Sequence, residues 1–175
     1  MSDKEYRKED AMYTLSAINE WTRSADSKTS ILMAFISLLL GFTLAVFDGI
    51  TYIAQLEKIN FLAVVIIMLL IIYVLSAAAA IVFSSLSLAA RLKFKNKGFN
   101  SIIYFGDIAE LSGEEFLSKT AQMTENDIVK DLKTQIVINS RISKRKLKYF
   151  NLGLISSIVL FASAIILLII IRFAV

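Results

Sequence analysis

The 175-residue sequence contains no cysteine, no histidine and no proline. Without cysteine it can form no disulfide and has no thiolate chemistry. Without histidine it lacks the commonest metal ligand and the commonest general base. Glycine-rich phosphate loops, zinc-ligand spacings and serine-nucleophile elbows are also missing. We therefore expect a protein without enzymatic activity, with no catalytic residues, no metal and no resident cofactor.

The absence of proline favours long helices, because a proline inside a helix breaks or kinks it. Apolar residues make up 57% of the chain, above the roughly 45–50% that is usual for soluble domains. They are concentrated in three blocks, at residues 31–47, 61–83 and 152–171. Each block is about long enough for a helix to cross a hydrocarbon core of roughly 30 Å. The predicted fold class is an all-α membrane protein with three transmembrane helices.

The basic residues are distributed unevenly between the segments outside these blocks. Residues 1–30 carry five Lys and Arg, the short loop 48–60 carries Lys58 alone, and residues 84–151 carry twelve. Lys and Arg accumulate on the cytoplasmic side of a membrane. We therefore predict that residues 1–30 and 84–151 are cytoplasmic, and that the 48–60 loop and the C-terminus face outward.

The cytoplasmic segments are predicted to be helical. Apolar residues in the 1–30 segment recur every three or four positions, which is typical of an amphipathic helix. We expect this helix to run without a break into the first span.

A second cytoplasmic helix is predicted to start at Thr124, whose hydroxyl can cap the Asp127 amide, and to continue into the third span. Ser112 and Glu115 predict a shorter helix. The second span is expected to extend to about Lys93, and residues 95–107 to be irregular. The three long helices would then form a cytoplasmic bundle with the short helix packed on its side, making 84–151 a cytoplasmic helical region.

Several stretches together carry a family resemblance. They are Asn19-Glu-Trp21 with Ala25-Asp26-Ser-Lys28, then Tyr104-Phe105-Gly106-Asp107-Ile108, then Asp131-Leu132-Lys-Thr-Gln135-Ile136 with Asn139-Ser140-Arg-Ile142 and Lys146. Their order and spacing, over nearly the whole chain, resemble the transmembrane effectors of Pycsar antiphage defence.

The resemblance implies a bacterial abortive-infection effector in the inner membrane, multi-pass, with a cytoplasmic N-terminus. A partner cyclase would sense infection and make a cyclic pyrimidine mononucleotide, cUMP or cCMP. The effector would bind this second messenger and impair the membrane, so that growth stops before the phage matures. The partners would be the lipid bilayer and the nucleotide, with no role for nucleic acid.

Two interpretations are open for Trp21, Arg23, Asp26 and Lys28, which precede the first span. In one, they line a nucleotide pocket or couple it to the span. Arg23 or Lys28 would meet the phosphate, Trp21 would stack on the base, and Asp26 would accept from a hydroxyl or amine. In the other, Lys28 is an interfacial anchor, and Asp26 is the ion partner of a basic residue on a neighbouring helix.

The remaining candidates lie in the long loop. Tyr104 and Asp107 could contact the ligand, or could form a turn packed on the bundle in which Asp107 is a cap. Gln135 and Asn139 lie four residues apart in an apolar stripe, where polar groups need partners. They could bond to one another or to Asp26, or read a base edge, and Arg141 lies next to that face.

A single chain with three nearly uncharged spans is too small to enclose a pore easily, so we expect a homo-oligomer. Serines within the spans could line a path or could simply be part of ordinary helix packing. The rival hypothesis is a non-enzymatic scaffold, or an accessory subunit of a transporter, without nucleotide gating. A neighbouring cyclase gene would favour the effector, and a neighbouring transporter gene would favour the rival.

Overall fold

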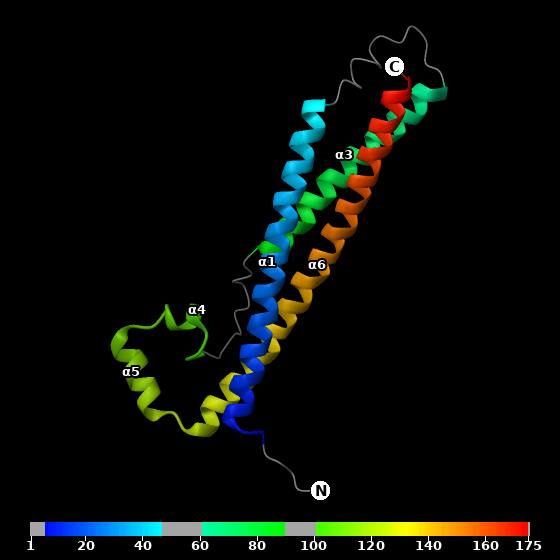
Figure 1. Cartoon of the computed structure of the whole chain (residues 1–175). Coiled ribbons are helices and arrows are strands. Elements are labelled where there is room, and N and C mark those ends of the chain that lie inside the picture. The colour runs from blue at the N-terminus through cyan, green and yellow to red at the C-terminus, as the bar shows by residue number, and fades with distance from the viewer. Residues whose placement is uncertain (1–5, 47–60, 90–100, 175) are drawn as a thin grey trace, which may run out of the picture. The chain divides into compact units, whose positions relative to one another are not determined.

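The computed structural model of the chain describes residues 6–46, 61–89 and 101–174 (Figure 1). Over these ranges its regular structure is entirely helical, which confirms the predicted all-α class. The helices are α1 (Lys8–Val46), α3 (Phe61–Leu88), α4 (Phe105–Ile108), α5 (Gly113–Gln122) and α6 (Glu125–Ala174).

Helices α1 and α6 each join a polar segment to an apolar one without a break. They contain 39 and 50 residues, and Figure 1 shows both as continuous coils. The predicted continuation of the leader into the first apolar block is therefore confirmed, as is that of the last amphipathic segment into the third. Phe47, which ends the first block, and the 48–60 loop lie outside the described residues.

Two helices are long and apolar enough to cross a membrane, namely α3 and α6. Only 28% of the apolar window of each is buried in the chain itself. The remaining side chains of these windows are partly or fully exposed. The third expected span, at residues 31–47, stays a prediction.

The chain divides into two compact units. Unit 1 comprises Met1–Ala25 with Ala90–Arg145, and unit 2 comprises Asp26–Ala89 with Lys146–Val175. Helices α1 and α6 contribute residues to both units, whereas the described residues of α3 belong to unit 2 alone.

Unit 2 is built from α1, α3 and α6 around a narrow core. The buried members are Leu32, Ile36, Ile66, Tyr73, Ala77, Ala80, Leu160, Ala164 and Leu167. Helices α3 and α6 approach each other closely at Gly153 of α6, where an added Cβ would lie 2.8 Å from the Ser84 Oγ and 3.4 Å from the Ser84 backbone nitrogen of α3. Glycine thus lets the two helices pack closely, as small residues do in membrane helix pairs.

The buried serines of unit 2 belong to this packing. Ser76, Ser157 and Ser163 donate to carbonyl groups of their own helices, at 2.8–2.9 Å. Their hydroxyl donors are thus used within the helix, and all three residues are buried in the packed chain. The packing interpretation of the span serines is therefore favoured for these three.

Unit 1 is a pair of helix segments closed by a short stretch of irregular chain. Ala11 and Leu15 of α1 pack with Leu132 of α6, and Ile103 adds to this core from the segment before α4. Within the described residues α3 ends at Leu88, and the predicted extension to about Lys93 falls on residues 90–93, which lie outside them. The expected three-helix bundle therefore stays a prediction.

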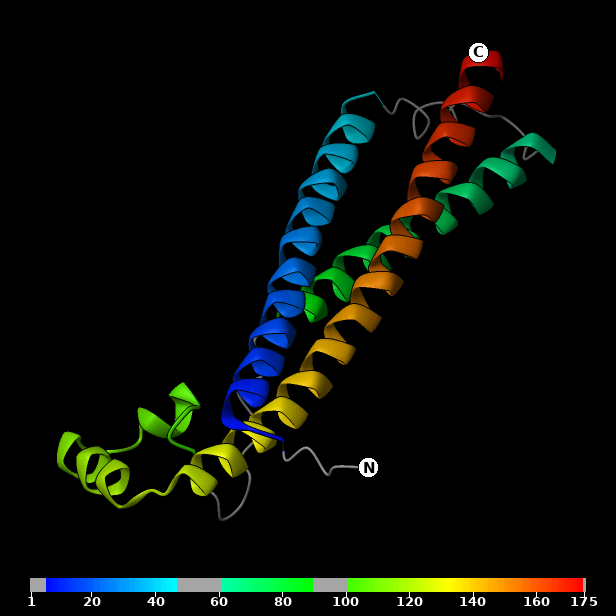
Figure 2. The same ribbon diagram turned by 60° about the horizontal axis from the view of Figure 1, so that its bottom comes forward.

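Helices α4 and α5 differ from the prediction in placement. Asp107 falls within α4, in a stretch predicted to be irregular. Helix α5 has no buried residue, and Figure 2 shows it as a short helix that a connecting segment joins to the start of α6. It does not pack on the side of a bundle, because its apolar side chains are too few to make a stripe. Leu117, for instance, is 68% exposed.

The two predicted helix starts are confirmed. Ser112 Oγ accepts from the Glu115 amide while the Glu115 carboxylate accepts from the Ser112 amide, a complete capping box. Thr124 and Asp127 make the equivalent reciprocal pair ahead of α6. These hydrogen bonds favour the charged carboxylates, so the backbone amide of Ser112 lowers the pKa of Glu115, and the Thr124 hydroxyl lowers the pKa of Asp127.

Candidate functional site

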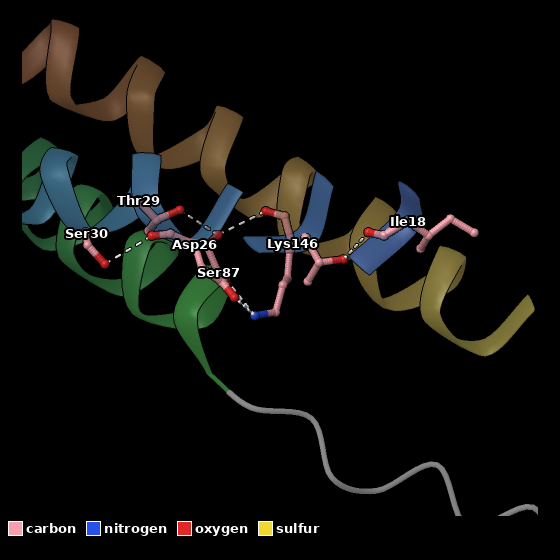
Figure 3. A network of polar contacts seen from close by, with 7 residues as sticks. Ile18, Asp26, Thr29, Ser30, Ser87 and Lys146 are labelled. Carbon is pink, nitrogen blue, oxygen red and sulfur yellow. Dashed lines mark hydrogen bonds and ion pairs between the residues drawn. The ribbon is translucent and has the colours of Figure 1, made fainter. Parts of the chain in front are cut away.

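Asp26 of α1 and Lys146 of α6 form an ion pair in unit 2 (Figure 3). The Lys146 Nζ lies 2.6 Å from Oδ1 and 2.8 Å from Oδ2 of Asp26, so the ammonium donates to both carboxylate oxygens. The lysine side chain is 9% exposed and the aspartate side chain 37%. Removing Asp26 would leave the lysine ammonium poorly solvated, which is the costly way to break such a pair.

Buried hydroxyls join the third helix to this pair. The hydroxyls of Thr29 in α1 and Ser87 in α3 lie 3.0 Å apart, and both residues are fully buried. Ser87 also donates to the Lys146 carbonyl, at 3.1 Å. We call Asp26, Thr29, Ser87 and Lys146 the polar network, and it links α1, α3 and α6 at one level (Figure 3).

The polar network can fix the relative rotation and height of three helices. A bidentate ion pair and two short hydroxyl contacts are directional, whereas apolar packing of alanine and leucine is not. None of its groups is a nucleophile with an adjacent base. Its chemistry suits holding or releasing a helix arrangement.

The four leader candidates are not gathered into one pocket. Trp21 is 67% exposed, and Arg23 and Lys28 are exposed as well. Among the described residues, Asp26 is the one member of the four with an ion pair. This matches the alternative in which Asp26 is the partner of a basic residue on a neighbouring helix. It also agrees with helical geometry, which does not place Trp21, Asp26 and Lys28 all on one face.

Tyr104 and Asp107 belong to a second polar cluster, in unit 1, which is centred on the buried Ser101. The Ser101 amide donates to Asp107 Oδ2 at 2.8 Å. The Ser101 hydroxyl accepts from the Ile103 and Tyr104 amides and donates to Asp131 Oδ2 at 2.9 Å. Asp107 therefore holds the turn before α4, in line with the structural interpretation, but it is not a helix cap: the N-cap of α4 is Tyr104, which has no side-chain cap hydrogen bond.

Asp131 is the anchor of this cluster. It is fully buried, and its Oδ2 also accepts from the Ile102 amide at 2.9 Å. Its Oδ1 has no hydrogen-bond partner within the described ranges. A buried carboxylate that takes two donors from one loop fixes that loop onto α6, because leaving these donors unpaired would be costly.

Tyr104 folds back over Gly106, where an added Cβ would lie 2.5 Å from the tyrosine ring. Its ring also packs against Phe105, with centroids 4.9 Å apart. A side chain at position 106 would therefore have to push the Tyr104 ring aside, and glycine lets the ring pack there, in line with the turn interpretation.

Gln135 is buried, and Asn139 is partly exposed. Asn139 donates to the Asn19 side-chain oxygen of α1 at 3.2 Å. The hydrogen-bond partner of Asn139 is therefore Asn19, and not Gln135 or Asp26 as the sequence had suggested. Arg141 is exposed and lines a groove of unit 1.

Sequence reasoning missed Lys146 and Asp131 as site residues. Lys146 belongs to a run of basic residues just before the third apolar block, which is typical of residues at a membrane surface. It lies four residues after Ile142, however, and so continues the apolar stripe of α6. Asp131 adjoins the same stripe, four residues before Gln135. Both are buried, and a charge at a stripe position was the signal that could have found them. Nothing in the local sequence marked Thr29, Ser87 or Ser101.

Comparison with known proteins places the chain in a family. Residues 10–173 match the family described as the Pycsar effector protein domain. The Pycsar effector protein GmPycTM from Gulbenkiania mobilis is 28% identical over 177 aligned positions, which cover 88% of this chain and 89% of that protein. No solved structure matches. With nearly all of its length matched, the chain belongs to the Pycsar effector family of antiphage defence proteins.

Proposed function

We propose that this chain is a multi-pass inner-membrane effector that binds a cyclic pyrimidine mononucleotide from a partner cyclase and, as a homo-oligomer, impairs the membrane. The observation that carries the proposal is the construction of unit 2. Many of its large apolar side chains lie outside its core, with Leu38 73%, Val74 60% and Ile158 60% exposed. Such a surface is suited to lipid or to further copies of the same helices.

The proposed topology has three spans, with the third supplied by residues 31–47. The excess of Lys and Arg in residues 1–30 and 84–151 favours a cytoplasmic N-terminus and an outward C-terminus. Reporter fusions at residue 175 and beside Lys119 test this topology. A cytoplasmic signal at residue 175 with an external one at Lys119 would reverse it.

An oligomer is proposed because one copy of unit 2 has no room for a path. Ile36, Ile66, Leu160 and Leu167 fill its centre and are at most 2% exposed. A lesion would then lie between copies or follow a rearrangement of the helices. A ligand drives such a change only through its difference in affinity for the two states, and a near-complete switch needs roughly 5.5 kcal/mol per cooperative unit. Several subunits would share this requirement.

The polar network is the proposed coupling element within unit 2. Lys146 and Asp26 lie on the two helices, α6 and α1, that also contribute residues to unit 1. A rotation of either helix would change the geometry of the ion pair directly. The coupling role first considered for Lys28 is thus transferred to Lys146, which has the partner.

The test is co-expression with the cognate cyclase, read out with a membrane-potential dye. Depolarisation and growth arrest are expected with the active cyclase, and neither with the effector alone. Equal depolarisation with a catalytically dead cyclase would remove nucleotide gating. No depolarisation in any combination, with normal effector abundance, would favour the scaffold or transporter-subunit hypothesis.

A further inference from the structure

Unit 1 contains a groove between the first turns of α1 and the start of α6. It has a volume of about 900 Å³, in the upper part of the range for small-molecule sites. Both walls carry cations. On one wall they are Lys8, the first residue of α1, and Arg7 just before it. On the other wall they are Lys130, Lys133 and Arg141 from α6.

The charge of the unit 1 groove is positive. Its lining has five cations and two carboxylates, Glu9 and Glu125, so the formal balance is 5 − 2 = +3. Arg7 lies 3.7 Å from Asp10. The other four cations form no salt bridge with any residue of the described ranges. Because the cations outnumber the carboxylates, they repel one another on balance, and an anion placed among them would relieve that repulsion.

The rest of the lining suits a flat, partly apolar molecule. Val129, Val137 and Ile138 give the groove an apolar side. The Tyr6 ring stands at one wall, with the Lys133 Nζ 5.4 Å from its centroid, a distance at which a cation is attracted to the ring face. Asn126 and Thr134 add donors and acceptors.

We propose that the unit 1 groove is the binding site for the cyclic mononucleotide, an inference that rests on the proposed function. Lys130, Lys133 and Arg141 would hold the phosphodiester, and Tyr6 would stack on the base. The carboxylates of Glu9 and Glu125 would accept from the ribose hydroxyl or an exocyclic amine. This ligand joins one negative charge to an aromatic ring and a sugar, and the groove offers a partner for each.

The groove also lies where a bound ligand could change the arrangement of α1 and α6. Its walls are the first turns of α1 and the start of α6, and both helices continue without a break into unit 2. Binding that draws these two walls together would favour one arrangement of the helix pair over another. The ligand would thus have the differential affinity that gating requires.

The experiment uses the full chain, purified in detergent, with radiolabelled cUMP and cCMP in equilibrium dialysis. Lys133→Gln and Arg141→Gln should each weaken binding about tenfold or more, since each removes a charged phosphate contact. Lys144→Gln is the matched control, because this exposed lysine lies on the same helix outside the groove. It should change binding less than about twofold.

A second measurement needs no variant. An amine-reactive label on the wild-type protein, read by mass spectrometry, should show Lys130 and Lys133 protected by the nucleotide and Lys144 unprotected. Unchanged labelling of Lys130 and Lys133 under saturating nucleotide would overturn the assignment even if the variants fail to fold.

The outcomes separate this inference from the proposed function. Wild-type binding that survives in both groove variants would overturn the groove and leave nucleotide sensing intact. No binding of cUMP or cCMP by the wild type would remove nucleotide sensing itself. Displacement of cUMP by inorganic phosphate, or by phosphatidylglycerol vesicles, as effectively as by unlabelled cUMP would overturn a nucleotide site in favour of a general anion or lipid-headgroup site.

Discussion

The two units of the chain use polar and apolar residues in opposite ways. In unit 1 a small apolar core lies under a charged surface, and Leu15 and Leu132 are buried while Arg23 and Arg141 are exposed. In unit 2 the core admits alanine, serine, threonine and a lysine, whereas leucine and isoleucine cover much of the outside. Burial of apolar surface from water can hold unit 1 together. It gives little between helices in lipid, so close packing and hydrogen bonds must hold unit 2.

This difference predicts where each unit is vulnerable. Unit 1 should depend on its apolar core and on the one buried carboxylate that organises its loop. Unit 2 should depend on the small size of Gly153, where α6 packs closely on α3, and on the directional contacts of the polar network. Substitutions of matched size in the two units should therefore separate the two sources of stability.

The largest effect is expected for Asp131→Ala in unit 1. The substitution leaves the buried Ser101 hydroxyl and the Ile102 amide without their acceptor, at roughly 1–3 kcal/mol for each group. We expect the free energy of unfolding of unit 1 to fall by roughly 2–5 kcal/mol. Hydrogen exchange of residues 101–108 and 125–140 in the purified protein measures it.

Asp131→Asn is the control of similar size and shape. It keeps one oxygen acceptor, so the free energy of unfolding of unit 1 should fall less than in Asp131→Ala. Exchange in residues 61–88 of unit 2 should be unchanged in both variants. Undiminished protection of residues 101–108 in Asp131→Ala would show that the loop is held by its apolar contacts instead.

The second largest effect is expected in unit 2, for Gly153→Leu. Even a Cβ at this position would press on Ser84 of α3, and overpacking usually costs about 1–3 kcal/mol. Gly41→Leu on α1 is the matched control, because nothing lies within 4 Å of a Cβ there. Thermal denaturation in detergent should show a lowered midpoint for Gly153→Leu alone. An equal drop in both variants would mean that helix propensity or insertion, and not close packing, is the cause.

The third effect concerns the polar network, with Lys146→Met as the variant. It leaves the Asp26 carboxylate without its partner, but water reaches that side chain, which is 37% exposed. We therefore expect only about 1 kcal/mol of lost stability. The larger consequence should be functional, with altered cyclase-dependent depolarisation at normal abundance. Lys148→Met is the control, because Lys148 is exposed on the same helix.

The reciprocal exchange sharpens this test. Asp26→Lys combined with Lys146→Asp restores opposite charges on the same two helices, and should recover more activity than the two single variants predict. Additive losses in the double variant would show that the pair does not act as a unit.

Sequence patterns predicted the parts of this structure that depend on local periodicity. The amphipathic stripe of α6 and the caps at Ser112 and Thr124 were all read correctly, because each is set by residues within a turn or two. The short helix α4 was not predicted, because the chain around it is held by contacts of Ser101 with Asp107 and Asp131 that lie outside one helical turn. The predicted extent of α3 toward Lys93 lies outside the described residues.

The candidate site was harder to predict for the same physical reason. Asp26 was found because a carboxylate beside an apolar run is conspicuous. Its partner, Lys146, lies 120 positions away, and only the three-dimensional fold brings the two together. Ser101 carries no local sign that its hydroxyl will accept two amides and bind Asp131.

The smallest effect is expected at the edge of unit 1, for Ser112→Ala. The substitution removes the cap of α5, a helix with no buried residue, so the loss should stay local. Hydrogen exchange in residues 113–122 should become about fivefold faster, while residues 125–140 keep their protection. Ser118→Ala, in the middle of the same helix, is the control.

The protection of α5 should also depend on pH. The pKa of Glu115 is held below its ordinary value of 4.5 by the Ser112 hydrogen bonds. A depressed carboxylate pKa stabilises the helix above the unfolded-state pKa, and this stabilisation is lost as the pH falls through the folded value. The Ser112 backbone amide, which is the main cause of the lowered pKa, remains in Ser112→Ala. The protection of residues 113–122, relative to the intrinsic exchange rate, should therefore fall on acidification in both the wild type and this variant, whereas Glu115→Gln should remove the pH dependence. Wild-type protection that is constant from pH 7 to pH 3 would show that the charged Glu115 does not stabilise the cap.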